Sequence, residues 1–185
     1  MDGTEKMYSV DLIEGERVYL RRITSEDTDK ILCWRNMPHV VERFIYREEV
    51  TRADHERWLK EQVGTGKVVQ FIIVVKESGK EIGSQYFTHI DLEKSNAEFG
   101  IFIGEIDALG KKYGTEVLQL ALKYAFEKMK LKEVYLRVLE DNERAIRVYE
   151  KCGLKICKEA SQEVLIHQKL KKVLVMKIER SNDYL

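Results

Sequence analysis

The sequence predicts an α/β fold with a mixed, mostly antiparallel and twisted central sheet of about seven strands and flanking helices. Two observations predict this class. Segments with the two-residue period of strands alternate with segments that carry the 3.6-residue period of helices. The centre of the chain also has the order strand, helix, strand, and such a βαβ unit pairs its two strands in parallel.

The first third of the chain predicts one strand and two helices. Residues 17–23 alternate apolar and polar side chains, as a half-buried strand does. Thr24–Asp27 has the [ST]-x-x-[DE] spacing of a capping box, which predicts a helix that ends near Asn36. Thr51–Asp54 has the same spacing, so we expect a second helix that stops at Gly64.

The remainder of the chain predicts the sheet and its crossover. Three strands of an antiparallel meander are followed by a helix, a strand, a short helix and a hairpin. Gly153 stands where a glycine commonly ends a helix, and the turn of the hairpin is expected near Gln168-Lys169. The predicted ranges are 68–75, 82–90, 97–103, 115–129, 134–139, 145–151 and 163–179.

Length and composition indicate a single domain over residues 1–185, with a core at about 16–179. The 32 basic and 32 acidic residues cancel, so the net charge gives no attraction to nucleic acid or to an anionic membrane, although a local basic patch is compatible with this balance. The acidic N-terminal segment has no apolar run typical of a secretory signal, and the apolar stretch 71–75 is too short to span a bilayer. We therefore expect a cytoplasmic protein with no nucleic-acid or membrane partner.

The cysteines and histidines show no spacing typical of a metal site. Three cysteines without a CxxC pair indicate free thiols: Cys33, Cys152 and Cys157. Three histidines lack clustered ligand spacing, so we expect no metal: His39, His55 and His167.

Two segments have patterns suited to chemistry. The loop Leu109–Glu116, LGKKYGTE, precedes the central helix, and a helix start with glycines and lysines suits a diphosphate. By itself, it is also an ordinary polar loop. Later in the chain, Asn142 and Tyr149 are seven residues apart and so lie on one helical face. A single tyrosine there is equally typical of a core or surface aromatic.

Together these segments resemble the GNAT superfamily, the GCN5-related N-acetyltransferases, over about residues 16–179. The family motif N-x-x-A-x-x-x-Y-x-K-x-G-[FL] is present in full from Asn142 to Leu154. Residues 97–103, AEFGIFI, resemble the family strand A-E-[ILF]-G-y-x-[IV].

The phosphate loop of the family, [QR]-x-x-G-x-[GA], is matched only in part. Gly114 and Thr115 fit, but Leu109 replaces Gln or Arg, and Lys112 replaces the first glycine. The first change removes a phosphate ligand. The second adds a side chain where clearance is usual, although a left-handed backbone is not necessarily required there. Both can lower cofactor affinity, while the backbone donors of the helix start survive.

The resemblance implies acetyl-CoA as co-substrate and no metal. The strands 97–103 and 134–139 would part, and CoA would lie between them. Phe102 and Ile103 would pair with the pantetheine through their main chain, and Asn142 would bond the same arm. The diphosphate would lie on the loop of Leu109, Gly110, Lys111, Lys112, Tyr113, Gly114 and Thr115.

The same resemblance implies the catalytic groups. An amine attacks a thioester as the neutral base, and the leaving thiol has an ordinary pKa of about 8.5. Tyr149 would donate a proton to the sulfur, and Glu98 would act as general base. Glu98 as a structural or substrate-binding carboxylate is the plainer alternative. His89 is the next choice for the base, followed by Glu140 and Asp141.

The acceptor is less defined. The stretches Trp34-Arg35-Asn36 and His55-x-x-Trp58 resemble two GNAT branches: the ribosomal-protein and spermidine N-acetyltransferases, and the nucleotide-sugar amino-acetyltransferases. A set of aromatic side chains could contact the acceptor or simply pack the helices on the sheet: Trp34, Phe44, Tyr46 and Tyr86. Three acidic residues could attract a polyamine or belong to a solvated loop: Glu42, Glu48 and Glu49.

We therefore expect an N-acetyltransferase that moves acetyl to a primary amine by direct attack in a ternary complex. The expected acceptor is a protein N-terminus or a small amine. A nucleotide-linked amino sugar is the alternative, and a CoA-binding sensor without turnover is a third possibility. A homodimer through the final hairpin or a sheet edge is also compatible with the sequence.

Overall fold

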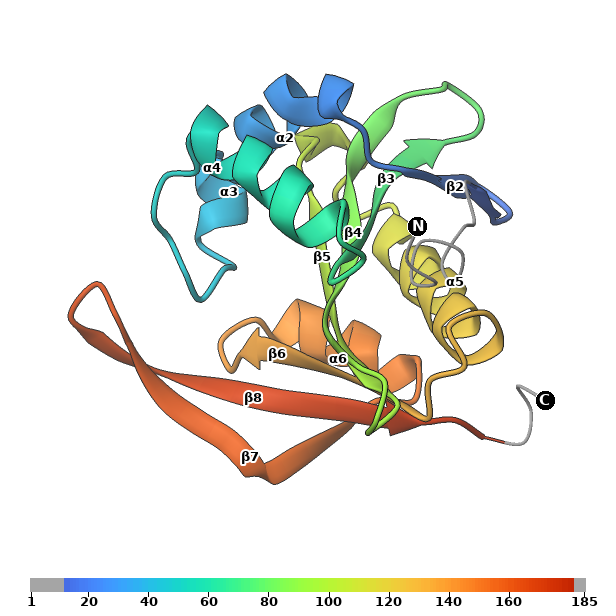
Figure 1. Ribbon diagram of the computed structural model, residues 1–185. Helices are drawn as coiled ribbons and strands as arrows, with labels where there is room; N and C mark the ends of the chain where they lie inside the picture. The colour runs from blue at the N-terminus through green and yellow to red at the C-terminus, as the bar shows by residue number, and fades with distance from the viewer. Residues whose placement is uncertain (1–11, 182–185) are drawn as a thin grey trace.

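The computed structural model describes residues 12–181, which form one eight-stranded sheet with helices on both faces (Figure 1). The strand order is β1-β2-β3-β4-β5-β6-β8-β7. The mixed α/β class is therefore confirmed. The additional strand is β1 (Leu12–Glu14), a short edge strand antiparallel to β2 (Val18–Arg22). The first eleven residues of the N-terminal segment lie outside the described part of the chain.

Both predicted capping boxes are confirmed. Thr24 precedes a 3-10 turn that leads into α2 (Thr28–Arg35), and the Thr24 amide donates to Asp27 Oδ2 at 2.8 Å. Thr51 caps α4 (Arg52–Trp58), whose last turn, Leu59–Val63, widens to π-helical geometry before Gly64. Sequence analysis missed α3 (Pro38–Val41) because four residues are too few to show a period.

The meander and the crossover are also confirmed. β3 (Val69–Val75), β4 (Glu81–Asp91) and β5 (Asn96–Ile103) run antiparallel to one another. Helix α5 (Tyr113–Glu127) then leads to β6 (Glu133–Leu139), which is parallel to β5. The parallel pairing covers three residue pairs only and ends at the pair of Glu98 and Tyr135. Beyond Glu98 the two strands part.

The C-terminal hairpin is longer than the sequence predicts. After α6 (Glu143–Lys151), Gly153 has a φ of 93° and ends the helix as expected. β7 (Lys155–Ile166) starts eight residues before the predicted 163, and β8 (Lys169–Glu179) follows. The turn is His167-Gln168, one residue before the prediction, and both residues have positive φ, as a two-residue hairpin turn requires. In Figure 1 the tip of this hairpin projects away from the helices.

The core has two main parts, one on each face of the sheet, and a small third cluster in which Leu139 of β6, Ile166 of β7 and Val173 of β8 meet. The larger part packs α5 and α6 against the sheet, and the predicted apolar face of α5 is fully buried there. Its most buried members on this helix are Val117, Leu118, Ala121, Leu122, Ala125 and Phe126. The smaller part packs α2 and α3 against β3, β4 and β5. Each large apolar side chain buried in this way contributes roughly 1.5–3 kcal/mol.

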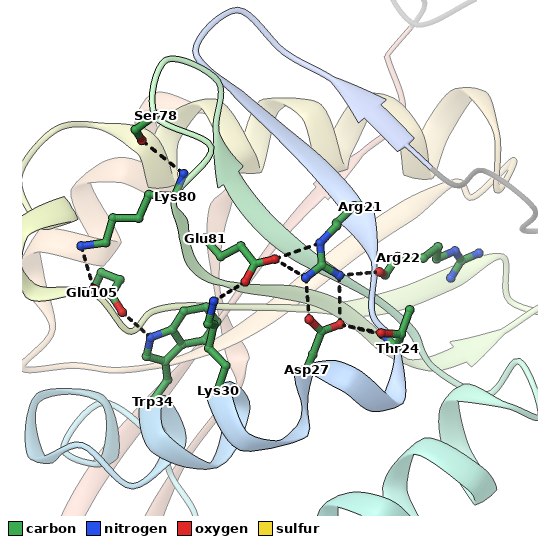
Figure 2. A network of polar contacts seen from close by, with 10 residues as sticks. All are labelled: Arg21, Arg22, Thr24, Asp27, Lys30, Trp34, Ser78, Lys80, Glu81 and Glu105. Atoms are coloured by element: carbon green, nitrogen blue, oxygen red, sulfur yellow. Dashed lines mark hydrogen bonds and ion pairs between the residues drawn. The ribbon is translucent and has the colours of Figure 1, made fainter.

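A network of charges joins α2 to the sheet (Figure 2). Arg21 on β2 donates to Asp27 at the start of α2, at 2.9 Å, and also contacts Glu81 on β4. Lys30 of α2 contacts the same Glu81. Near the end of α2, the Trp34 indole donates to Glu105 Oε1 at 2.8 Å. These contacts fix the helix that forms one wall of the site described next.

Candidate active site

A cavity of about 730 Å³ opens where β5 and β6 part. Its walls come from the loop before α5, the start of α6, the open ends of β5 and β6, and the helices α2 to α4. Of the predicted site residues, all but Trp34 and Lys111 line it. Segments that are more than 100 residues apart along the chain therefore meet in one space.

The loop before α5 has the geometry of an anion site. Gly110 and Lys112 both have left-handed backbone, with φ of 83° and 65°. Within the described residues, no acceptor contacts the amide N–H groups of the five consecutive residues Gly110 to Gly114. Free amides at the start of a fifteen-residue helix attract a phosphate through both hydrogen bonds and the helix dipole.

The left-handed backbone at Lys112 explains why the family has glycine there. The sequence does not require this conformation, but the structure has it, and Lys112 is the N-cap of α5. In this conformation the Cβ of an L-residue crowds the following carbonyl, at a cost of about 1–2 kcal/mol. Lys112 therefore holds a strained backbone conformation, and the amides of the loop remain free to bind an anion.

No sequence pattern predicts the residues that hold the loop from outside. Arg17, before β2, donates from Nη1 to the Lys111 carbonyl at 2.9 Å and lies over the Tyr113 ring at 4.4 Å. In return, Glu116 Oε1 accepts the backbone amide of Arg17 at 2.8 Å. A contact between segments 94 residues apart leaves no local pattern in the sequence. Lys111, used in this way through its carbonyl, does not line the cavity.

The predicted pair on α6 faces the cavity. Asn142 is the N-cap of α6, where its Oδ1 accepts from the Ala145 amide at 3.4 Å. This role leaves its amide N–H₂ group available to a ligand. Two turns later, burial raises the pKa of Tyr149, with a smaller effect from Tyr86. The phenol therefore stays protonated at neutral pH, in the form that can donate a proton.

Glu98 is not an isolated carboxylate. Arg137 of β6 donates to both of its oxygens, at 2.7 and 3.2 Å, and the hydrogen bond to Glu98 raises the pKa of Arg137. His89 Nδ1 is 3.0 Å from Glu98 Oε2. His89 has a positive φ of 49° at an irregularity in β4, and such a bulge redirects a side chain. Because a carboxylate only accepts, His89 Nδ1 carries the proton in this contact, and in the neutral ring Nε2 is an acceptor.

Trp34 lies in the core and not among the residues that line the cavity, as the alternative of packing the helices on the sheet expects. It is 1% exposed, its ring packs edge-on against Phe102, and it does not line the cavity. The close approach needs Gly104, where a Cβ would lie 2.1 Å from the Trp34 ring. The tryptophan therefore joins α2 to the sheet.

The other predicted aromatic residues line the cavity. Phe44 packs edge-on against Phe102 with ring centroids 6.0 Å apart. Tyr86 lies over Gly100, where any Cβ would clash with its ring at 2.2 Å. Tyr46 is 74% exposed at the rim. These three side chains remain available to contact an acceptor.

The charges that line the cavity are mostly positive. The cations are Arg35, Arg43, Lys112, Arg137 and Arg144, and the acids are Asp54 and Glu98. Both acids are already paired, Glu98 with Arg137 and Asp54 with Arg57. The three acidic residues that might attract a polyamine, Glu42, Glu48 and Glu49, are not among the lining residues.

Arg35 is a partly buried cation without a carboxylate. Its guanidinium lies 3.6 Å from the centroid of the Phe44 ring, and burial lowers its pKa. Among residues 12–181 no acid lies within ion-pair distance of it. A cation in such a position favours an anionic group of a ligand.

Three further properties concern the described residues. Within residues 12–181 no helix is long and apolar enough to cross a bilayer. The same part of the chain has no group of three His, Cys, Asp or Glu side chains placed to hold a metal ion. All three cysteines are free thiols.

Comparison with known proteins agrees with this geometry. Residues 17–155 match the family described as acetyltransferase (GNAT) domain. The chain belongs to the GNAT acetyltransferases. Within this GNAT family, spermidine N(1)-acetyltransferase of Escherichia coli K12 is 31% identical over 103 residues, which are 56% of this chain and 55% of that protein. An uncharacterized Methanocaldococcus jannaschii protein, MJ1062, is 28% identical over 158 residues, 84% of this chain and 31% of its own length.

A solved structure confirms the GNAT fold. The crystal structure of spermidine N-acetyltransferase from Vibrio cholerae in complex with CoA and spermine matches with a TM-score of 0.81 at 22% identity. The match covers 88% of this chain and 95% of that one. By contrast, the chain spans about half of the length of the E. coli spermidine N(1)-acetyltransferase and about a third of the length of MJ1062.

The residues present fit acetyl-CoA. Five free amides and Lys112 suit its diphosphate. Beyond Glu98, the edge of β5 that faces β6 has no partner strand, so the main chain at Phe102 and Ile103 can pair with an extended amide-bearing arm.

Proposed function

We propose that this chain is an acetyl-CoA-dependent N-acetyltransferase that acetylates a primary amine by direct attack in a ternary complex. The observation that carries the proposal is the single cavity in which an anion-binding loop, an unpaired strand edge, Tyr149 and the Glu98–His89 pair meet. Membership of the GNAT family supports the same reaction.

The reaction requires four contributions. Acetyl-CoA supplies an acetyl group activated as a thioester. The backbone amide near Ile103 donates to the carbonyl that accumulates negative charge. Tyr149 donates its proton to the sulfur as the C–S bond breaks. The amine nitrogen forms the new C–N bond and gives up a proton to a base.

We assign the base to the pair rather than to the Glu98 carboxylate alone. Both Glu98 oxygens are already bonded to Arg137, whereas His89 Nε2 can accept a proton in the neutral ring whose proton lies on Nδ1. In this arrangement His89 accepts the proton of the amine, directly or through water, and Glu98 holds the ring through Nδ1. Glu98 then acts as a positioning residue, a revision of the role that the sequence suggests.

The charge of the cavity favours an acceptor that carries both an amine and an anionic group. Its acids are paired, while Arg35 has no carboxylate partner among the described residues and Arg43 forms no ion pair within 4 Å there. The aromatic Phe44 and Tyr86 can pack on a flat or sugar ring. Of the acceptors that the sequence suggests, a nucleotide-linked amino sugar fits these features best.

A polyamine is the second candidate acceptor. The similarity to spermidine N(1)-acetyltransferase of E. coli favours it. Against it stands the charge, because a polycation beside unpaired arginines is repelled.

The test is a screen of amines with acetyl-CoA, followed by release of the CoA thiol. The panel contains amino-sugar nucleotides, spermidine, N-terminal peptides of ribosomal proteins and aminoglycosides. We expect the highest kcat/KM on an amino-sugar nucleotide, and a roughly tenfold or greater loss in Arg35→Ala. Arg52→Ala is the control, since Arg52 pairs with Asp29 and Glu56 and none of these three residues lines the cavity.

Other results of the screen would change the proposal. Preference for spermidine would assign the second candidate acceptor. Tight binding of acetyl-CoA without turnover on any amine would assign a CoA sensor instead.

A further inference from the structure

Arg144 lies beside the phosphate loop although it belongs to a different segment of the chain. It is the second residue of α6 and lines the cavity. A Cβ at Gly110 would lie 3.7 Å from Arg144 Nη2, so the guanidinium faces the loop that offers free amides. The Arg144 guanidinium and the free amides of the loop therefore face the same part of the cavity.

The acids around Arg144 are all engaged elsewhere. Glu143 binds Arg147 at 3.1 Å, and Glu140 binds Lys172 at 2.8 Å. Asp141 contacts Lys171. Among the described residues Arg144 itself has no hydrogen bond or ion pair. The charge of Arg144 is therefore not compensated by these residues, whereas each of the three nearby acids is paired with a cation.

The side chain at position 109 cannot bind a phosphate. Leu109 lines the cavity at 39% exposure and can donate no hydrogen bond. A guanidinium is well suited to replace a lost phosphate ligand because its planar donors bind two oxygens at once.

We propose that Arg144 binds the diphosphate of CoA and supplies the side-chain contact that Leu109 cannot make. The inference rests on the proposed function, since it needs CoA in this cavity. It adds a cofactor contact from α6 to the backbone contacts from the start of α5.

The first experiment is calorimetric titration of the full chain with CoA. We expect Arg144→Ala to weaken binding about tenfold or more, as loss of a charge-assisted contact does. The matched control is Arg147→Ala, one turn later on the same helix, exposed and outside the cavity lining. It should bind CoA as the unsubstituted protein does, and circular dichroism should show both variants folded.

The second experiment moves the cation. In the Arg144→Ala background, Leu109→Arg should recover most of the lost affinity, whereas in the unsubstituted protein it should gain less than about threefold. Dephospho-CoA separates the two phosphate sites of the ligand. If Arg144 binds the diphosphate, the tenfold loss persists with dephospho-CoA.

Three outcomes separate the possibilities. Equal CoA affinity in Arg144→Ala and the unsubstituted protein overturns the inference and leaves the proposed function intact. A loss that disappears with dephospho-CoA overturns the diphosphate assignment in favour of the 3′-phosphate. Failure of the unsubstituted protein to bind CoA at millimolar concentration overturns both the inference and the proposed function.

Discussion

Arg137 on β6 donates two hydrogen bonds to the Glu98 carboxylate on β5 at the point where these parallel strands part. Glu98 is the last residue of β5 that pairs with β6. The ion pair therefore lies where the pairing of β5 with β6 ends, and both of its residues line the cavity. It also leaves His89 as the group in contact with Glu98 that has a free acceptor nitrogen.

This arrangement predicts that His89 and Glu98 act as a unit. We expect His89→Ala and Glu98→Gln each to lower kcat about 10²-fold, because the first removes the base and the second weakens the contact that orients it. The double variant should lose little more, since Glu98 acts only through His89. Steady-state kinetics with the best acceptor measures this. Glu133→Gln breaks a comparable pair with Lys177 away from the cavity and should leave kcat unchanged. Full activity in His89→Ala would return the role of base to Glu98.

Tyr149→Phe should lower kcat about 10²-fold or more, because the leaving sulfur then lacks its proton donor. Burial raises the pKa of Tyr149 above the usual value for a phenol, so the donor form persists throughout the assay range. The profile of kcat against pH should therefore show no loss from this group below about pH 10. Rapid-quench measurement of the chemical step tests the role directly, and an unchanged rate in Tyr149→Phe would remove it from the mechanism.

The buried phenols also predict how stability depends on pH. Burial raises the pKa of Tyr86 to about 12, and the pKa of Tyr149 is raised as well. A phenol whose pKa is raised in the folded state binds its proton more tightly there than in the unfolded chain, where the pKa is about 10. These groups leave stability unchanged below pH 10, and the free energy of unfolding should fall as pH rises above it. Denaturant titrations at pH 9 and pH 11 should show a smaller fall in Tyr149→Phe.

Lys112→Gly should stabilise the fold by about 0.5–1 kcal/mol. The left-handed backbone is strained for lysine and free of strain for glycine, and the greater entropy of glycine in the unfolded chain offsets part of the gain. Urea unfolding measures the difference. The control is Lys111→Gly. Because Lys111 is not among the residues with positive φ, this substitution should lower the free energy of unfolding by about 0.5–1 kcal/mol. Loss of stability in Lys112→Gly would contradict the strain at this residue.

Trp34→Phe should lower the free energy of unfolding by about 1–3 kcal/mol and leave the KM for the acceptor within about twofold. The smaller ring leaves a cavity and removes the hydrogen bond to Glu105, but it touches no substrate. Phe44→Ala is the comparison, because Phe44 lines the cavity and its loss should raise the acceptor KM about tenfold. A raised KM in Trp34→Phe with unchanged stability would restore its role as an acceptor contact.

Local patterns in the sequence determined most of the fold. The capping boxes at Thr24 and Thr51 and the glycine at 153 act within a few residues, so their effect can be predicted without tertiary contacts. The apolar period of α5 likewise predicts which side chains are buried. The phosphate loop and the run from Asn142 to Leu154 are continuous segments, and the structure brings both to one cavity as the family resemblance implies.

Tertiary structure alone decided the partners within the site. Arg17 meets Lys111, Arg137 meets Glu98, and Arg144 faces Gly110 across separations of 94, 39 and 34 residues. Trp34 can pack in the core because Gly104, just after β5, has no Cβ that would clash with its ring. The net charge of the cavity also depends on which acids are paired and which face away. A sequence pattern acts over one or two turns of chain, whereas electrostatics and packing act through space, and only the folded chain brings these groups within a few ångströms.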